Sequence, residues 1–176
     1  MKNQTADNQP TGDTATDDPR IVAVWDALAG VADPEIPTVN VVELGMIAGV
    51  RVDGDHVIVD MTPTFAGCPA LDVIKADIAR AVTSSGEALV TVRVVYDPPW
   101  TSDRITEEGR RKLKAFGLAP PGERCSGGAG PNLERTACPY CGSTDTDLES
   151  IFGPTLCRSM HYCHHCQQPF EHFKAV

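Results

Sequence analysis

The chain has little positive charge and lacks a long apolar segment. Its 176 residues include 15 Lys and Arg against 24 Asp and Glu, which gives a net charge of −9 and a pI near 4.9. Affinity for a phosphate backbone comes mainly from basic side chains, so this balance argues against a nucleic-acid-binding protein. No apolar run approaches the roughly 18 residues of a membrane span. We therefore expect neither nucleic acid nor a membrane as a partner.

Familiar catalytic patterns are also missing. The sequence shows no Ser-His-Asp order, no phosphate-binding loop and no open metal triad of His and carboxylate residues. An enzyme in its own right is therefore not expected. The first 17 residues contain no large apolar side chain beyond Met1, so they should form a disordered tail. They also lack the apolar core of a secretory signal, and we expect a cytoplasmic protein with reduced thiols.

The most informative residues of the chain are its seven cysteines. Four of them form two C-x-x-C pairs. These are Cys138-Pro-Tyr-Cys141 and Cys163-His-His-Cys166, which 21 residues separate. Each pair makes a tight knuckle, and two knuckles brought together by a hairpin provide a tetrahedral four-thiolate site. Gly142 follows the first knuckle and permits a left-handed turn there. The spacing predicts a structural zinc site.

Two questions about this site stay open at the level of sequence. An iron–sulfur cluster on the same cysteines is the alternative to zinc, because both use four thiolates. Cys157 lies six positions before Cys163 and is an alternative ligand. Nearby side chains that can also bind metals are His161, His164, His165 and His172. A glutaredoxin-type redox role for the first pair is disfavoured, because turn residues follow it and a helix does not.

Hydrophobic periodicity predicts the element order α-β-β-α-β-α before the cysteine module. The predicted elements are a helix from Asp18-Pro19 to about residue 32, a hairpin turning at 53–55, a helix from about Pro69, a strand over 90–96 and a helix over 104–116 with Phe116 inward. This order describes a small α+β sandwich. We predict the following organisation: tail 1–17, α+β domain 18–117, linker 118–131 and zinc-ribbon-like module 132–176. The first domain should have its own core and survive loss of the metal.

Outside the metal module, Cys68 is the strongest candidate for a functional thiol. It stands near the start of the predicted central helix, where free backbone amides lower a thiol pKa. Thr64 is close enough in sequence to bond the sulfur or a ligand. Asp33 and Glu35, fixed between prolines, either present carboxylates to a metal or complete the turn. An inert, buried Cys68 is the competing interpretation. Cys125 in the linker is predicted to be a free thiol without a role.

Several segments in this order resemble a known family. They are 33–37 (DPEIP), 44–47 (LGMI), 62–64 (TPT), 67–70 (GCPA), 97–100 (DPPW), 108–110 (EGR), 118–121 (LAPP) and 169–174 (PFEHFK). The α+β part resembles the domain family associated with iron–sulfur and metal-centre assembly. Together with the cysteine module, the chain resembles the D-subunit family of the bacterial phenylacetyl-CoA epoxidase pathway over about residues 18–176.

This resemblance implies an accessory role in aerobic phenylacetate degradation. The family's system includes an oxygenase with a di-iron centre and an iron–sulfur flavoprotein reductase, and the D-type subunit is thought to help mature a metal centre. The resemblance places the family's reactive cysteine at Cys68. Expected partners are the oxygenase and reductase subunits or iron–sulfur carriers, and a homodimer is an open possibility. Expected cofactors are Zn²⁺ and a transient iron or iron–sulfur cluster. A purely structural docking subunit is the alternative function.

Overall fold

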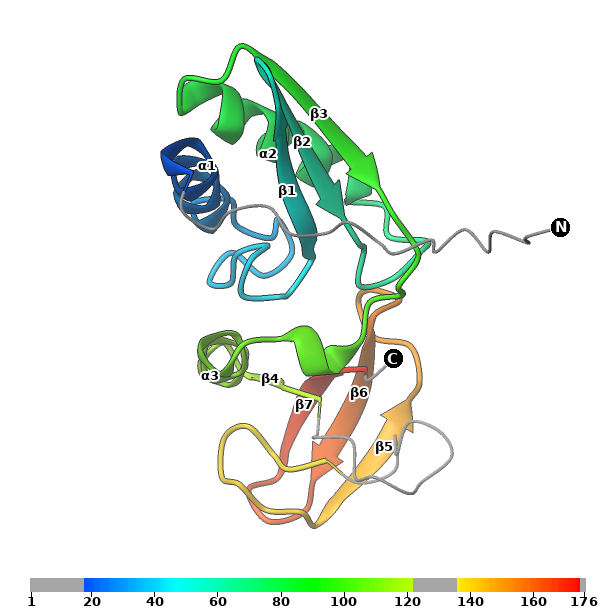
Figure 1. Ribbon diagram of the computed structural model, residues 1–176. Helices are drawn as coiled ribbons and strands as arrows, with labels where there is room; N and C mark the ends of the chain where they lie inside the picture. Colours follow the sequence, from blue (N-terminus) through cyan, green and yellow to red (C-terminus); the bar gives the residue numbers. More distant parts are fainter. Residues whose placement is uncertain (1–17, 122–135, 175–176) are drawn as a thin grey trace, which may run out of the picture.

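The structure is a computed structural model, which describes residues 18–121 and 136–174. It contains two sheets, one above the other along the molecule (Figure 1). The predicted tail, Cys125 and most of the predicted linker lie outside the described residues. Within the described residues, no helix is long and apolar enough to cross a membrane.

The upper sheet and its helices form the expected α+β unit. Its elements are α1 (Pro19–Ala29), β1 (Ile47–Asp53), β2 (His56–Met61), α2 (Leu71–Ser84) and β3 (Leu89–Val94). β1 and β2 form an antiparallel hairpin, and β3 pairs with β2 in parallel. A parallel pair needs a crossover, which α2 provides. The predicted α+β class is confirmed for this part.

The core of this unit lies between the sheet and the two helices. Asp18 caps α1 by accepting a 2.8 Å hydrogen bond from the backbone N–H of Arg20, as its position before Pro19 predicts. The inward face of β2 is fully buried, with Val57 and Met61 at 0% exposure. The alternating pattern of the hairpin therefore sets which strand face meets α1 and α2.

The second half begins with a 3-10 turn (Ser102–Arg104) and α3 (Glu107–Ala115), which lie between the two sheets (Figure 1). Phe116 follows α3 and is 45% exposed, so the expectation that it faces inward was wrong. The helix ends at Ala115, one residue earlier than predicted, and Phe116 is its C-cap. The preceding segment is tied to the upper unit, since the indole N–H of Trp100 donates to the carbonyl of Leu44 at 2.9 Å.

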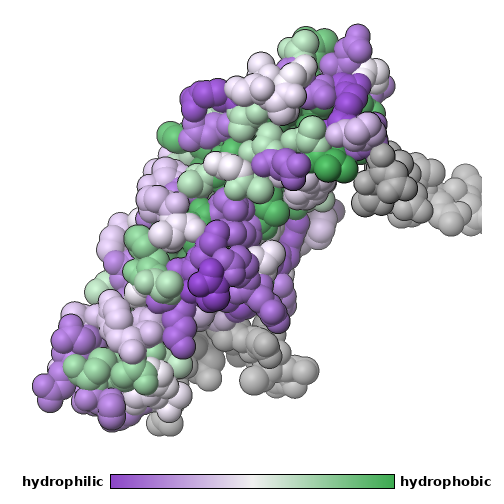
Figure 2. Space-filling model, turned by 90° about the vertical axis from the view of Figure 1, so that its left-hand side faces the viewer, coloured by the Kyte–Doolittle hydropathy of each residue, from purple (hydrophilic) through white to green (hydrophobic). Residues whose placement is uncertain are grey.

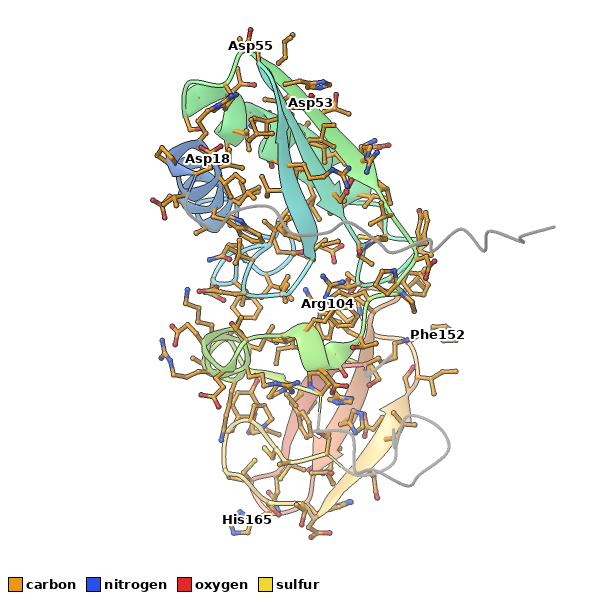
Figure 3. All side chains as sticks on the ribbon, viewed as in Figure 1. Asp18, Asp53, Asp55, Arg104, Phe152 and His165 are labelled. Carbon is orange, nitrogen blue, oxygen red and sulfur yellow. The ribbon has the colours of Figure 1, made fainter. Side chains whose placement is uncertain are left out.

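Gly45 explains part of the LGMI motif. Its φ is +65°, and a Cβ atom there would lie 2.3 Å from the carbonyl oxygen of Arg104. Glycine is required both by the left-handed backbone and by this close approach. The Arg104 guanidinium, between the sheets in Figure 3, donates to the carbonyl of Ile47 at 3.0 Å. The motif thus joins the two halves of the chain.

The lower sheet is the metal module, and it is larger than predicted. Its strands are β4 (Leu118–Ala119), β5 (Thr146–Ser150), β6 (Arg158–Cys163) and β7 (Gln168–Phe173), in the order β4-β7-β6-β5. Leu118 and Ala119, expected in the linker, form β4 and pair with β7 in parallel.

Both halves of the chain contribute to one hydrophobic core. Phe173 of β7 is 2% exposed and Leu118 is also 2% exposed, and both belong to the core of the upper unit. The rings of Phe173 and Trp100 have centroids 6.0 Å apart. The predicted domain 18–117 supplies most of this core, and Leu118 and Phe173 extend it. A core aromatic residue near the end of the chain completes it.

On the face that Figure 2 shows, hydrophilic residues predominate and apolar residues form small, separate patches. Large exposed apolar residues occur in both halves of the described chain, and three of them lie on the loop between β5 and β6. That loop exposes Ile151 at 49%, Phe152 at 60% and Leu156 at 47%.

Candidate functional site

Four cysteine sulfurs meet at the end of the ribbon that carries His165, farthest from the upper unit (Figure 3). The Sγ atoms of Cys138, Cys141, Cys163 and Cys166 all lie within 4.8 Å of one another. Two pairs are 3.6 Å apart, namely Cys138 with Cys166 and Cys141 with Cys163. The predicted convergence of the two knuckles is confirmed.

The two knuckles have the same backbone geometry. Gly142 follows the first with φ +77°, and Gln167 follows the second with φ +58°. Each of these residues donates its N–H to the carbonyl of the first cysteine of its knuckle, at 2.9 Å in both cases. The left-handed turn expected at Gly142 is present, and its counterpart uses a non-glycine residue. This repeated turn directs backbone N–H groups at the sulfur atoms.

The donor set fits a tetrahedral metal ion. Zinc–sulfur bonds of about 2.3 Å place the sulfurs of a regular tetrahedron about 3.8 Å apart, close to the two 3.6 Å separations. Backbone N–H groups of Cys166 and His165 contribute to lowering the pKa of Cys163 to about 6. Burial and the neighbouring thiols raise the pKa of Cys166 to about 12, so a bound cation would be needed to stabilise all four thiolates together. The four cysteines would hold the ion and leave no open position for substrate.

Three of the four neighbouring histidines are engaged elsewhere. His161 is fully buried and stacks on Phe170, with ring centroids 5.5 Å apart. His172 is 3% exposed and contacts the His161 ring edge-on. His164 bonds to Asp147 at 2.8 Å. Two of these histidines thus belong to the interior of the ribbon, and a third pairs with a carboxylate.

Cys157 is not part of the four-sulfur cluster. It directly precedes β6, whereas Cys163 is the last residue of that strand. Six residues of extended chain span about 20 Å, so the two sulfurs lie at opposite ends of the ribbon. Cys157 packs instead against the shared core. Its place is in a second site, at the junction of the ribbon and the upper unit.

This second site is a small pocket between the two halves of the chain. Its polar lining consists of Asp33, Glu35, Thr64, Cys68 and Cys157. Apolar residues that sequence reasoning did not identify complete the lining: Ile36, Leu44, Met46, Pro63, Leu71, Ile74 and Phe173. The cavity volume is about 10 Å³, roughly the space of one water-sized sphere. This is room for one small ion or water molecule.

Cys68 lies in this pocket, just before α2. The backbone N–H of Ala70 bonds to its sulfur and favours the thiolate, as the position before the helix predicts. Burial outweighs this effect, and the carboxylates of Glu35 and Asp33 add to it, so the pKa of Cys68 is raised. The expected lowering of its pKa was therefore wrong. A bound cation would reverse the effect, because it stabilises a thiolate directly.

Asp33 and Glu35 have different tasks. One carboxylate oxygen of Asp33 accepts hydrogen bonds from the N–H groups of Glu35 and Ile36, at 2.8 and 2.9 Å. Asp33 therefore closes the DPEIP turn, as one of the two sequence interpretations predicts, and also lines the pocket. The backbone carbonyl of Glu35 accepts a 3.0 Å hydrogen bond from Arg158.

Arg158 is the functional neighbour that sequence reasoning missed. Its guanidinium, 7% exposed, bridges the Glu35 carbonyl of the upper unit and the Glu171 carboxylate of β7, the latter at 2.8 Å. The one available signal was its position directly after Cys157, at the start of β6, which does not reveal a partner 123 residues away.

The comparisons with known proteins agree with this architecture. Residues 21–94 match the family described as "Iron-sulfur cluster assembly protein", and residues 124–174 match the "PaaD zinc beta ribbon domain". A crystal structure titled as a domain of unknown function DUF59 from Bacillus anthracis is 30% identical with a TM-score of 0.50. It covers 53% of this chain and 91% of its own. The chain thus combines an iron–sulfur-assembly-type domain with a ribbon of four cysteines.

Two curated relatives narrow the assignment. The chain is 36% identical to an Escherichia coli protein named as the D subunit of a "Putative 1,2-phenylacetyl-CoA epoxidase", over 159 residues that cover 90% of this chain and 94% of the relative. It is also 42% identical over 88 residues to an "Fe-S protein maturation auxiliary factor" of Porphyromonas gingivalis. That match covers 49% of this chain and 83% of the relative. The chain belongs to the D-subunit family of phenylacetyl-CoA epoxidase.

Proposed function

We propose that this protein is an accessory subunit of a phenylacetyl-CoA epoxidase system that helps to mature a di-iron or iron–sulfur centre through Cys68. The observation that carries the proposal is the pocket at Cys68, which has room for an ion and offers thiol and carboxylate donors together. The names of the relatives, one an epoxidase subunit and the other a maturation factor, support the same role.

The donor side chains of the Cys68 pocket suit transfer of iron to another protein better than its storage. Among the described residues, the ribbon cysteines form the only group of three or more donor atoms within 4.8 Å of one another. The pocket residues do not form such a group, so an ion bound there would need further ligands from a recipient protein. In this proposal the iron is cargo, and the chain itself catalyses no oxygenation.

Zinc in the ribbon has a separate, structural task in this proposal. The ion would fasten the far end of the sheet through the four knuckle cysteines, and β7 then carries Phe173 into the shared core. Such modules draw much of their folding free energy from the metal. A reducing cytoplasm, where the thiols stay free, is the location that this chemistry requires.

The test is to produce the oxygenase and reductase subunits with and without this chain and to measure iron per subunit by elemental analysis. The proposal expects under-loaded iron in one client when the chain is absent, restored when it is present. Equal iron in both preparations would refute a maturation role.

A docking subunit without metal transfer is the second candidate. The loop between β5 and β6 favours it, because Ile151, Phe152 and Leu156 are about half exposed and Phe152 points away from the body of the molecule (Figure 3). In that case, replacing the wild type with Phe152→Ser should weaken assembly of the oxygenase complex and leave its iron content unchanged.

A further inference from the structure

We propose that Cys157 of the ribbon and Cys68 of the assembly-type domain act together as a two-thiol site for one thiophilic divalent cation. The inference deepens the proposed function and rests on it for the identity of the cargo, which would be Fe²⁺. The site exists only when the two parts of the chain are packed together, because each contributes one sulfur.

The first support is the shared pocket. Both cysteines line the same cavity, and Asp33, Glu35 and Thr64 also belong to its lining. The two thiols are close enough that Cys157 contributes to raising the pKa of Cys68. Both side chains are free thiols and half-buried. Mixed sulfur and carboxylate donors suit a borderline divalent ion, whereas oxygen donors alone would favour Mg²⁺ or Ca²⁺.

The second support is the way in which Cys157 is held. Its carbonyl accepts a 2.9 Å hydrogen bond from the N–H of Lys174, and the Thr155 hydroxyl lies 3.1 Å from its sulfur. The next residue, Arg158, bonds to the carbonyl of Glu35 at 3.0 Å. The loop that carries Cys157 is thus fastened to the loop that carries the pocket carboxylates.

Binding would proceed by exchange of protons for the ion. Each thiol releases its proton when its sulfur binds, so M²⁺ replaces two protons and the charge of the pocket is unchanged. The carboxylates that disfavour two free thiolates then favour the bound cation, and the cation neutralises the two thiolates that burial disfavours. No oxidant is needed, and the cysteines stay at the thiol oxidation level.

The experiment uses the full-length chain, loaded with zinc at the ribbon and kept anaerobic, and adds Co²⁺ alone as the probe. Sulfur-to-cobalt charge-transfer absorption reports thiolate ligands, and elemental analysis verifies that the zinc stays bound. We expect one Co²⁺ per chain beyond the zinc. Cys68→Ser and Cys157→Ser should each lose about half of the charge-transfer absorption per cobalt and weaken binding at least about tenfold, since even outer-shell partners contribute roughly 10–100-fold.

Matched controls lie on the same loops. Ala66→Ser and Leu156→Ser change exposed neighbours of the two cysteines and should bind Co²⁺ like the wild type. Cys157→Ala serves as a second variant, and circular dichroism verifies folding. A readout without mutation is alkylation mapped by mass spectrometry, in which Co²⁺ should protect Cys68 and Cys157 in parallel.

Failure of the inference and failure of the proposed function give different results. If zinc-loaded wild type binds no second ion, or if both Cys157 variants bind it with wild-type affinity and spectrum, the two-thiol site is wrong. If Cys68→Ser lowers the iron content of a client subunit and Cys157→Ser does not, the maturation role stands and the participation of Cys157 is refuted.

Discussion

Replacing Phe173 with alanine should destabilise the whole chain, and not the ribbon alone. The side chain comes from the last strand, is 2% exposed, and packs in the core of the upper unit beside Trp100. Truncating a buried phenylalanine costs about 3–5 kcal/mol, because transfer and cavity terms add. With a urea m-value of about 2–3 kcal/mol/M for a chain of this size, the unfolding midpoint should fall by about 1.5 M.

The assay is urea unfolding of zinc-loaded protein, followed by tryptophan fluorescence in a Trp25→Phe background so that Trp100 reports alone. Phe116→Ala is the matched control, since that ring is 45% exposed, and it should cost less than about 1 kcal/mol. Equal midpoints for Phe173→Ala and the unsubstituted background would refute the shared core. A large loss in Phe116→Ala would refute the placement of α3.

Three further predictions concern single positions. The pKa of His172 is lowered to about 4 by burial and by the charge of the adjacent histidine. The contribution of His172 to the free energy of unfolding should be complete above its unfolded pKa of about 6.5. It should be lost as the pH falls towards 4, and the full loss is about 3 kcal/mol. NMR should show its ring neutral at pH 5.5, while His164, whose pKa is raised by its bond to Asp147, is protonated. Gly45→Ala should cost at least about 1–3 kcal/mol in thermal unfolding, because its φ is +65°, and should cost more than Gly49→Ala, where nothing lies within 4 Å. Cys166→Ser should abolish zinc binding by elemental analysis and lower the stability of the upper unit as well; retained zinc would exclude this ligand.

Local patterns predicted the elements well because each was encoded within a few residues. Asp18-Pro19 marks a helix start, the period-two spacing of Val57, Val59 and Met61 marks a buried strand face, and paired C-x-x-C segments mark knuckles. These signals depend on backbone geometry and side-chain period alone. They do not depend on what the rest of the chain does.

The junction between the halves could not be predicted in the same way. Phe173 has the alternation of an ordinary ribbon strand, and nothing near it in sequence indicates that its ring completes a distant core. The predicted direction of the Cys68 pKa shift was wrong for a related reason. The amide at the start of α2 was foreseeable, but the burial that outweighs it depends on residues more than 30 positions away and on the docked ribbon.

The most direct test of the maturation role is the iron content of the client subunits produced with Cys68→Ser in place of the wild-type chain. Ala66→Ser is the control on the same loop, and the zinc content of each variant verifies that the ribbon is intact. We predict normal zinc and normal association with the client, but iron reduced to the level found without this chain. Fully loaded iron with Cys68→Ser would contradict the maturation role and leave docking as the function of this subunit.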